Sequence, residues 1–201
     1  TMEEEPLMTL NTQIPYEFKD KTLLVRAFTH KSYFNESEDK SIGHNERLEF
    51  LGDAVLDLTL SHMLMDGFPQ LEEGDLSRLR ASLVNEMAFA ELALELNLAE
   101  HILLGKGELN SGGKQKPRLL ASVFEALIGA IYLDGGFGKA DTVLKGLYAE
   151  KVKQLDVENQ YAGDFKTRLQ EVTQEMFKVI PCYEVVDSSG PDHLKVFTIA
   201  V

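Results

Sequence analysis

The sequence contains only one cysteine, Cys182, among its 201 residues. A single cysteine excludes an internal disulfide and any zinc cluster built on several thiolates. None of the five histidines stands three or four residues from another, which excludes a pair of histidine ligands on one helix face. A metal ion in this protein would therefore be a hard cation bound through oxygen atoms.

Long hydrophobic runs are also missing. No apolar run approaches the ~18 residues of a membrane span, and the opening stretch, residues 1–5, lacks the basic start of a signal peptide. We therefore expect no membrane partner and a cytoplasmic location. With 44% hydrophobic and 26% charged residues, the composition is that of a globular protein with one domain, or one and a small second.

Basic residues are scarce, since 20 Lys and Arg stand against 33 Asp and Glu, giving a net charge of −13. Taken alone, this balance argues against a nucleic-acid partner, because Lys and Arg dominate phosphate binding. The segment with Lys106, Lys114, Lys116 and Arg118 is not a P-loop, since the required Gly-Lys-Ser/Thr is absent. We expect no nucleotide cofactor.

Apolar residues recur at helical spacing through the first 155 residues. Asn45 is predicted to cap a long helix, and residues 35–43 and 105–114 are predicted to be loops. A mainly α fold follows from this pattern. The predicted helices span residues 23–28, 45–65, 75–96, 117–133 and 140–154.

The pattern changes after the polar stretch 156–163, a candidate linker. A predicted helix at 164–177 is followed by two stretches typical of strands, 183–186 and 195–201, on either side of a Ser-Ser-Gly-Pro turn. We therefore predict a helical domain at 1–155 and a partial α+β domain at 164–201. The second domain is expected to be incomplete, because so short a segment buries little apolar surface.

Acidic residues occur where a buried helix is expected. Glu49 and Asp53 are four residues apart and so share a helix face, where two anions repel unless a proton or cation lies between them. Glu125 is the lone acid of an apolar helix. Three acids from two helices can converge on Mg²⁺, or Mn²⁺ as a substitute, which predicts hydrolysis of a phosphodiester without a covalent intermediate.

A simpler interpretation leaves Glu49 and Asp53 on a solvated face and pairs Glu125 with a basic residue such as Arg47 or Arg78.

Two other enzyme classes are disfavoured. A ribonuclease that cleaves through attack by the 2′-hydroxyl would need a pair of histidines as general acid and base, and no such pair is evident. A helical phosphohydrolase acting on nucleotides would need a His-Asp pair among its metal ligands, and the pair that has helical spacing, His62 and Asp66, lies apart from Glu49 and Asp53 in the sequence.

Four ordered blocks of the sequence carry a resemblance to a known family; they are Phe28–Tyr33, Asn45–Leu56, Glu73–Ser77 and Phe124–Gly136. These blocks resemble the ribonuclease III family, and the resemblance covers nearly the whole chain. It implies an all-helical endonuclease domain that forms a homodimer and cuts both strands of double-stranded RNA. The cut would leave 5′-phosphate ends and short 3′ overhangs, and processing of rRNA and mRNA is the expected role.

By this resemblance, the family's catalytic metal ligands fall on Glu49, Asp53 and Glu125. The fourth ligand position falls on Ser122, where the family usually has an acid. A serine supplies no negative charge, so we expect weakened metal affinity more than lost activity. The competing hypothesis is a catalytically silent, double-stranded RNA-binding or ribosome-associated relative in which Ser122 marks a decayed site.

The resemblance also places Glu46 and Glu73 near the cleavage site, although they could equally be solvated or dimer-contact carboxylates. Phe50 is expected at the dimer interface, with a place in the core as the alternative. Lys106, Lys114, Lys116 and Arg118 are expected to be mobile surface residues near the active face that can reach the RNA backbone.

The C-terminal segment resembles the front half of a double-stranded RNA-binding domain in residues 164–174 and 190–193. Such domains contact 2′-hydroxyls and phosphates across minor grooves. The family's lysine-rich final helix would follow Val201 and is absent from this sequence. We therefore expect weak RNA binding that depends on divalent ions. The implied contact residues are Thr167, Gln170, Glu171, Gln174 and His193.

Overall fold

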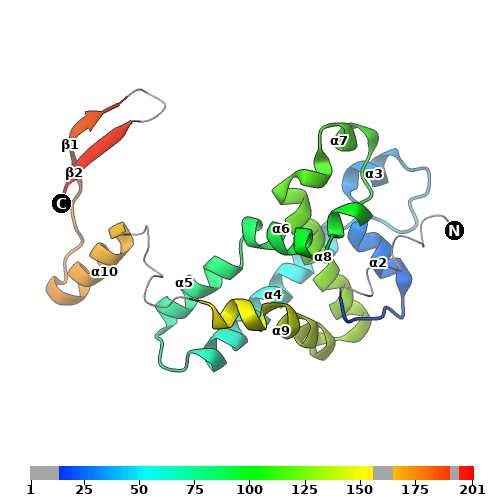
Figure 1. Ribbon diagram of the computed structural model, residues 1–201, viewed down its shortest axis with the longest axis horizontal. Coiled ribbons are helices and arrows are strands. Elements are labelled where there is room, and N and C mark those ends of the chain that lie inside the picture. Colours follow the sequence, from blue (N-terminus) through cyan, green and yellow to red (C-terminus); the bar gives the residue numbers. More distant parts are fainter. Residues whose placement is uncertain (1–13, 156–164, 191–194) are drawn as a thin grey trace. The chain divides into compact units, whose positions relative to one another are not determined.

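The computed structural model describes residues 14–155, 165–190 and 195–201, except the side chains of Phe165, Thr167 and Arg168. The chain divides into two compact units, residues 1–155 and 156–201, which we describe separately. The first unit is built of helices and the second contains a helix and a hairpin (Figure 1). The prediction of a mainly α fold is confirmed. The predicted linker, 156–163, lies outside the described residues.

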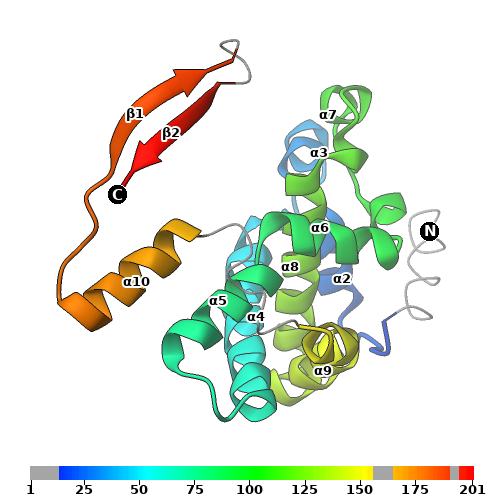
Figure 2. The same ribbon diagram turned by 60° about the vertical axis from the view of Figure 1, so that its left-hand side comes forward.

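Helix α8 (Pro117–Gly135) is the central element of the first unit. Pro117 stands at its first position, where the missing N–H costs no hydrogen bond, and Gly136 with φ 78° follows its end. Phe124, Leu127 and Ile128 are fully buried in it. Figure 2 shows α8 surrounded by the helices that pack on it, which are α2 (Lys21–Phe28), α4 (Glu46–Gly67), α6 (Glu86–Glu95) and α9 (Phe137–Lys153).

Helices α4 and α8 approach each other so closely that their backbones touch. A Cβ atom on Gly52 would lie 1.8 Å from the carbonyl oxygen of Glu125, and one on Gly129 would lie 2.1 Å from the carbonyl oxygen of Leu48. Only glycine fits at these two positions. Because Gly52 precedes Asp53, this contact brings the acidic residues of α4 next to Glu125.

The single helix predicted for 75–96 is wrong, because the structure contains two helices there. Helix α5 (Glu73–Leu83) ends at Val84, whose ψ is 80°, and α6 begins after Asn85. The Asn85 side chain accepts a hydrogen bond from the Ala88 N–H and so caps α6. A local cap therefore interrupts a continuous apolar periodicity.

The segment predicted as a loop at 105–114 also contains helical structure. It holds α7 (Lys106–Asn110) and the first two residues of a 3-10 turn, Gly113–Gln115. The remaining short elements of the first unit are α3 (Lys31–Glu36) and the 3-10 turn Leu98–His101. Among the described residues, no helix has the length and apolar content that crossing a bilayer requires.

The second unit contains α10 (Phe165–Phe177) and two antiparallel strands, β1 (Glu184–Ser189) and β2 (Val196–Ala200). Their register shifts between Val185 and Asp187, an irregularity of the kind that bends a strand. The predicted helix and hairpin are therefore confirmed as local elements. Their apolar residues, such as Val186 and Phe197, are exposed.

Candidate active site

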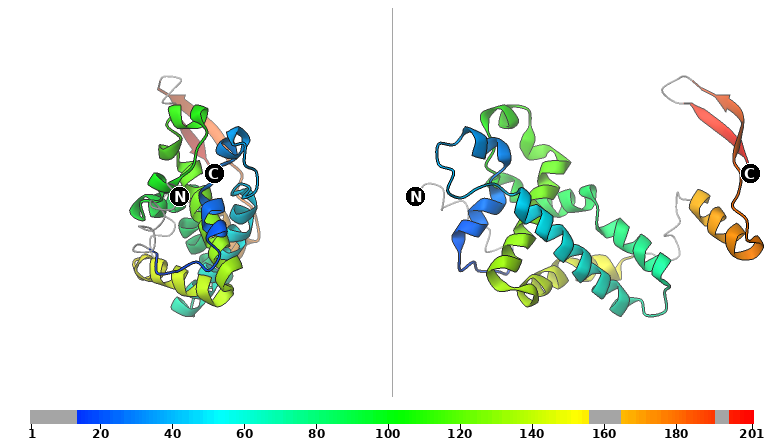
Figure 3. Two further views of the ribbon diagram at one scale, coloured as in Figure 1. Left: turned by 90° about the vertical axis from the view of Figure 1, so that its right-hand side faces the viewer. Right: turned by 180° about the vertical axis from the view of Figure 1, so that it is seen from behind.

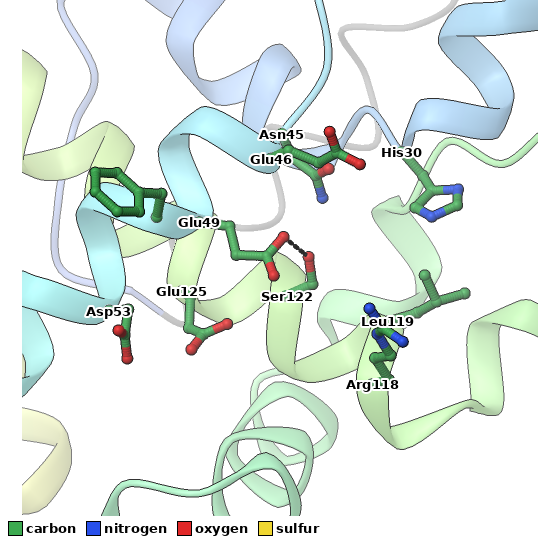
Figure 4. A pocket seen from close by; sticks show the side chains of 10 residues that line it. His30, Asn45, Glu46, Glu49, Asp53, Arg118, Leu119, Ser122 and Glu125 are labelled. Carbon is green, nitrogen blue, oxygen red and sulfur yellow. Dashed lines mark hydrogen bonds between the residues drawn. The ribbon is translucent and has the colours of Figure 1, made fainter.

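A pocket of about 540 Å³ lies where the N-terminal half of α4 meets α8. Figure 4 shows Glu49 and Asp53 on α4 facing Ser122 and Glu125 on α8. The three acidic side chains predicted from the sequence therefore line one pocket, together with Ser122. The remaining lining residues are His30, Asn45, Glu46, Phe50, Arg118 and Leu119.

Ser122 makes a direct contact across the pocket, because its hydroxyl donates a hydrogen bond to Oε2 of Glu49. The hydrogen bond turns the Glu49 carboxylate toward Ser122, while the carboxylates of Asp53 and Glu125 lie further along the pocket (Figure 4). Ser122 thus holds Glu49 in place without adding a charge.

The electrostatics of the pocket are those of crowded anions. Burial, and then the charges of Glu49 and Asp53, raise the pKa of Glu125 from 4.5 to about 8. Burial, and then the charge of Asp57, raise the pKa of Asp53. Within the described part of the chain, Glu125 has no basic partner, and Arg78 instead pairs with Asp75 at 2.8 Å. The alternative that Glu125 is neutralised by Arg47 or Arg78 is therefore wrong.

The pocket fits a hard divalent cation, because its donors are carboxylate and hydroxyl oxygens. The ionisation of Glu125, which is half-buried among them, is disfavoured without a cation. A cation among these oxygens would relieve the repulsion that raises the Glu125 pKa. In the part of the chain that the structure describes, no three His, Cys, Asp or Glu side chains stand close enough to hold a metal ion without moving. The Glu49 carboxylate would have to turn from Ser122 toward Glu125.

Asn45 and His30 are pocket residues that sequence reasoning did not single out as site residues. Asn45 precedes α4 with helical φ and ψ and makes no side-chain cap, so its predicted capping bond is wrong. Its side chain is 1% exposed, and Nδ2 has no hydrogen-bond partner among the described residues. Both residues lie within the sequence blocks that resemble the family, and that was the available signal.

The predicted basic residues are placed differently from one another. Arg118 lines the pocket, whereas Lys106, Lys114 and Lys116 are not among its lining residues. Lys114 Nζ donates to the carbonyl oxygen of Glu100, and Lys116 pairs with Glu108 at 2.5 Å. Lys114 and Lys116 are therefore tied to the protein surface.

Glu46 and Glu73, predicted near the cleavage site, also differ. Glu46 lines the pocket and pairs with Lys31 at 3.1 Å. Glu73 is exposed in the first turn of α5, accepts a hydrogen bond from Ser77, and is not among the residues that line this pocket.

Phe50 projects from the surface of the first unit, with 83% of its area exposed, which excludes a place in the core of this chain. Beside it lies a groove of about 510 Å³, lined by residues that include Leu51 and Leu133. Further along α4, Leu58 and Met65 are also exposed. The right panel of Figure 3 shows α4 running along this face of the first unit.

The predicted RNA-contacting residues of the second unit are described in part. Gln170 is half-buried in α10, and Glu171 and Gln174 are exposed on it. The Thr167 side chain and all of His193 lie outside the described residues.

Comparison with known proteins identifies the family of this chain. The sequence profile of the Ribonuclease-III-like family matches residues 20–152. The chain is 47% identical over 193 residues to Ribonuclease 3 of Bdellovibrio bacteriovorus, covering 96% of this chain and 82% of that protein. It is 49% identical over 192 residues to Ribonuclease 3 of Campylobacter jejuni, covering 96% and 83%.

Solved structures give the same result. The nuclease domain of ribonuclease III from Campylobacter jejuni superimposes with a TM-score of 0.66 at 50% identity, covering 73% of this chain and 96% of that domain. A second structure of that domain, with a TM-score of 0.65 and 51% identity over 70% and 94% of the chains, concerns a flexible region involved in its dimer formation. This chain therefore belongs to the ribonuclease III family of endoribonucleases.

Proposed function

We propose that this endoribonuclease cuts double-stranded RNA in the pocket between α4 and α8, with Glu49, Asp53 and Glu125 holding Mg²⁺ or, as a substitute, Mn²⁺. The observation that carries the proposal is the convergence of these acids on one pocket, where the pKa of Glu125 rises to about 8. Such a pocket is a poor place for three carboxylates without a cation.

Four residues of the pocket would have distinct parts in this reaction. Glu125, the most buried acid, would bind the cation at the base of the pocket, and Asp53 and Glu49 would close it from α4. When bound, a divalent cation polarises a phosphate oxygen and activates a water molecule for attack. Ser122 would orient Glu49 through its hydrogen bond. The product ends would be a 5′-phosphate and a 3′-hydroxyl, with short 3′ overhangs.

We also propose that the active form is a homodimer assembled on α4. Phe50 and the groove with Leu51 and Leu133 give one face both a protruding aromatic side chain and a recess of apolar character. A two-fold interface requires such self-complementarity, since the same patch is used by both copies. Two pockets in one dimer would serve the two RNA strands.

The second unit is proposed to be the front part of a double-stranded RNA-binding domain, residues 164–201, joined by the linker 156–163 to the nuclease domain 1–155. The polar face of α10 with Gln170, Glu171 and Gln174 would meet a minor groove. Thr167 and His193 belong to the same proposal, as do Lys106 and Lys114 as backbone contacts.

Cleavage of a perfect RNA duplex by Glu125→Gln tests the proposed site. The change removes the charge of the most buried acid, and we expect the rate in Mg²⁺ to fall more than roughly 100-fold, beyond the loss seen when supporting residues of metal sites are changed. Glu91→Gln, an exposed acid of α6 outside the pocket, is the matched control. Product formed without a divalent ion, or undiminished product from Glu125→Gln, would refute the proposal.

A further inference from the structure

His30 is held in place by its backbone. Its N–H donates to the carbonyl oxygen of Leu103 at 3.1 Å, and the Leu103 N–H donates to Phe28 at 2.9 Å. The Asn45 N–H donates to the carbonyl oxygen of Thr29 at 2.9 Å. Since Asn45 immediately precedes α4, these bonds fix the position of His30 relative to the helix that carries the acidic residues.

The contacts at Nδ1 assign the tautomer of the His30 imidazole ring. The backbone N–H of Ser32 donates to Nδ1 at 3.2 Å, so Nδ1 acts as an acceptor and carries no proton. The Ser32 hydroxyl lies 2.8 Å from the same Nδ1 and itself accepts from the Gly105 N–H at 2.9 Å. The ring proton is therefore on Nε2.

The ring is also neutral near pH 7. Burial lowers the pKa of His30 below its ordinary value, and the neighbouring His44 acts weakly in the same direction. The nearby carboxylates oppose this effect without reversing it; they are Glu108, Glu46 and Glu49. A neutral imidazole with Nδ1 occupied offers one N–H donor, on Nε2.

Arg118 stands at the same end of the pocket as His30, opposite Asp53 (Figure 4). Its side chain is exposed, and among the residues that the structure describes it forms no ion pair. Asn45 lines the same pocket, and its Nδ2, which has no hydrogen-bond partner among the described residues, is a further donor. We call His30 and Arg118 the donor edge. The pocket thus has Asp53 and Glu125 at one end and the His30 and Arg118 donors at the other, where the Glu46 carboxylate, paired with Lys31 at 3.1 Å, also lies.

We propose that the donor edge binds the phosphodiester next to the one being cut. His30 Nε2–H donates to a non-bridging oxygen of that phosphate, and Arg118 supplies the positive charge. This inference rests on the proposed function, in which the acidic end and its cation hold the scissile phosphate. A neighbouring phosphate without its own cation needs N–H donors and positive charge, and the donor edge provides both.

The competing explanation is that His30 serves only to cap α3. Asn, Asp, Ser and Thr are the usual residues for that purpose, and His30→Asn separates the two roles. Asn retains an acceptor at the position of Nδ1 but lacks a donor at the position of Nε2. We expect unchanged thermal stability and a kcat/KM for duplex RNA lowered roughly 10- to 100-fold, the value of a hydrogen bond to a charged group.

Arg118→Gln is the second variant, because its exposed side chain can be changed without disturbing the fold. We expect a loss in kcat/KM of roughly 10-fold that shrinks as salt concentration rises. Lys139→Gln, which removes a positive charge from an exposed site on α9 outside the pocket, is the matched control and should stay within about 2-fold of wild type.

A phosphorothioate scan identifies the contact directly. Sulfur replaces one non-bridging oxygen at a time on either side of the cut, in Mg²⁺, and cleavage by wild type, His30→Asn and Arg118→Gln is compared. Wild type should slow at one phosphate adjacent to the scissile one, and the two variants should lose that sensitivity. Equal sensitivity of all three proteins, or full activity of folded His30→Asn, would overturn the inference. Absence of cleavage by wild type would instead count against the proposed function.

Discussion

Replacing Ser122 by aspartate is the most informative perturbation of the site. The Ser122 hydroxyl donates to Oε2 of Glu49, so an aspartate side chain would place a second carboxylate beside the first. In the metal-free protein the two charges would repel, and Glu49 would lose its donor. With a divalent cation bound, the same carboxylate would become an additional ligand.

The expected magnitude follows from Coulomb's law. Two unit charges about 4 Å apart interact by about 1 kcal/mol in water and about 4 kcal/mol at an effective dielectric constant of 20. Since the pocket is open to solvent, Ser122→Asp should lower the free energy of unfolding of the metal-free protein by roughly 1–4 kcal/mol. The attraction to a doubly charged cation is larger than the repulsion, so the Mg²⁺ concentration for half-maximal cleavage should fall by at least roughly 10-fold.

Two measurements test this reasoning. Thermal melting in EDTA should give a lower Tm for Ser122→Asp than for wild type, and addition of Mg²⁺ should raise the variant's Tm more steeply. A cleavage assay over a range of Mg²⁺ concentrations should show the shift in the half-maximal value. Ser122→Ala is the control that removes only the hydroxyl. An unchanged or higher Mg²⁺ requirement in Ser122→Asp would contradict the assignment of this position to the cation site.

Three further predictions concern packing, pH and assembly. Gly52→Ala should lower the Tm strongly and raise the Mg²⁺ requirement, because its Cβ would lie 1.8 Å from a backbone oxygen of α8. Gly146→Ala, with no atom within 4 Å of the added Cβ, should instead stabilise α9 by about 0.5–1 kcal/mol. Because the folded pKa of Glu125 is raised to about 8, the metal-free protein should lose stability as pH rises from about 4.5 to about 8. Chemical denaturation in EDTA measures this loss, and the part of it due to Glu125 should be missing in Glu125→Gln. In the unaltered protein, the apparent Mg²⁺ affinity should rise over the same pH range. Phe50→Asp should convert a dimer to monomers in sedimentation velocity, since it removes an exposed aromatic anchor, and an unchanged sedimentation coefficient would contradict the proposed interface.

The sequence alone determined the helical character of the first unit and the identity of its acidic residues. Apolar periodicity gave α4, α8 and α9 nearly to their ends, because helix faces follow local spacing. Glu125 stood out since a lone acid in an apolar helix needs a partner. The division into α5 and α6 was not predicted, because the apolar stripe continues past Val84 and Asn85 while the chain does not continue as a helix.

Only the tertiary structure decided which side chains meet. Gly52 and Gly129 allow α4 and α8 to touch, and that contact sets Glu49 and Asp53 beside Glu125. His30 reaches the same pocket through hydrogen bonds to Leu103, far away in the sequence. Periodicity reports which face of a helix is buried, but the partner of that face depends on steric fit between segments distant along the chain. For the same reason, the sequence did not distinguish Arg118, which lines the pocket, from the lysines a few residues away, which do not line it.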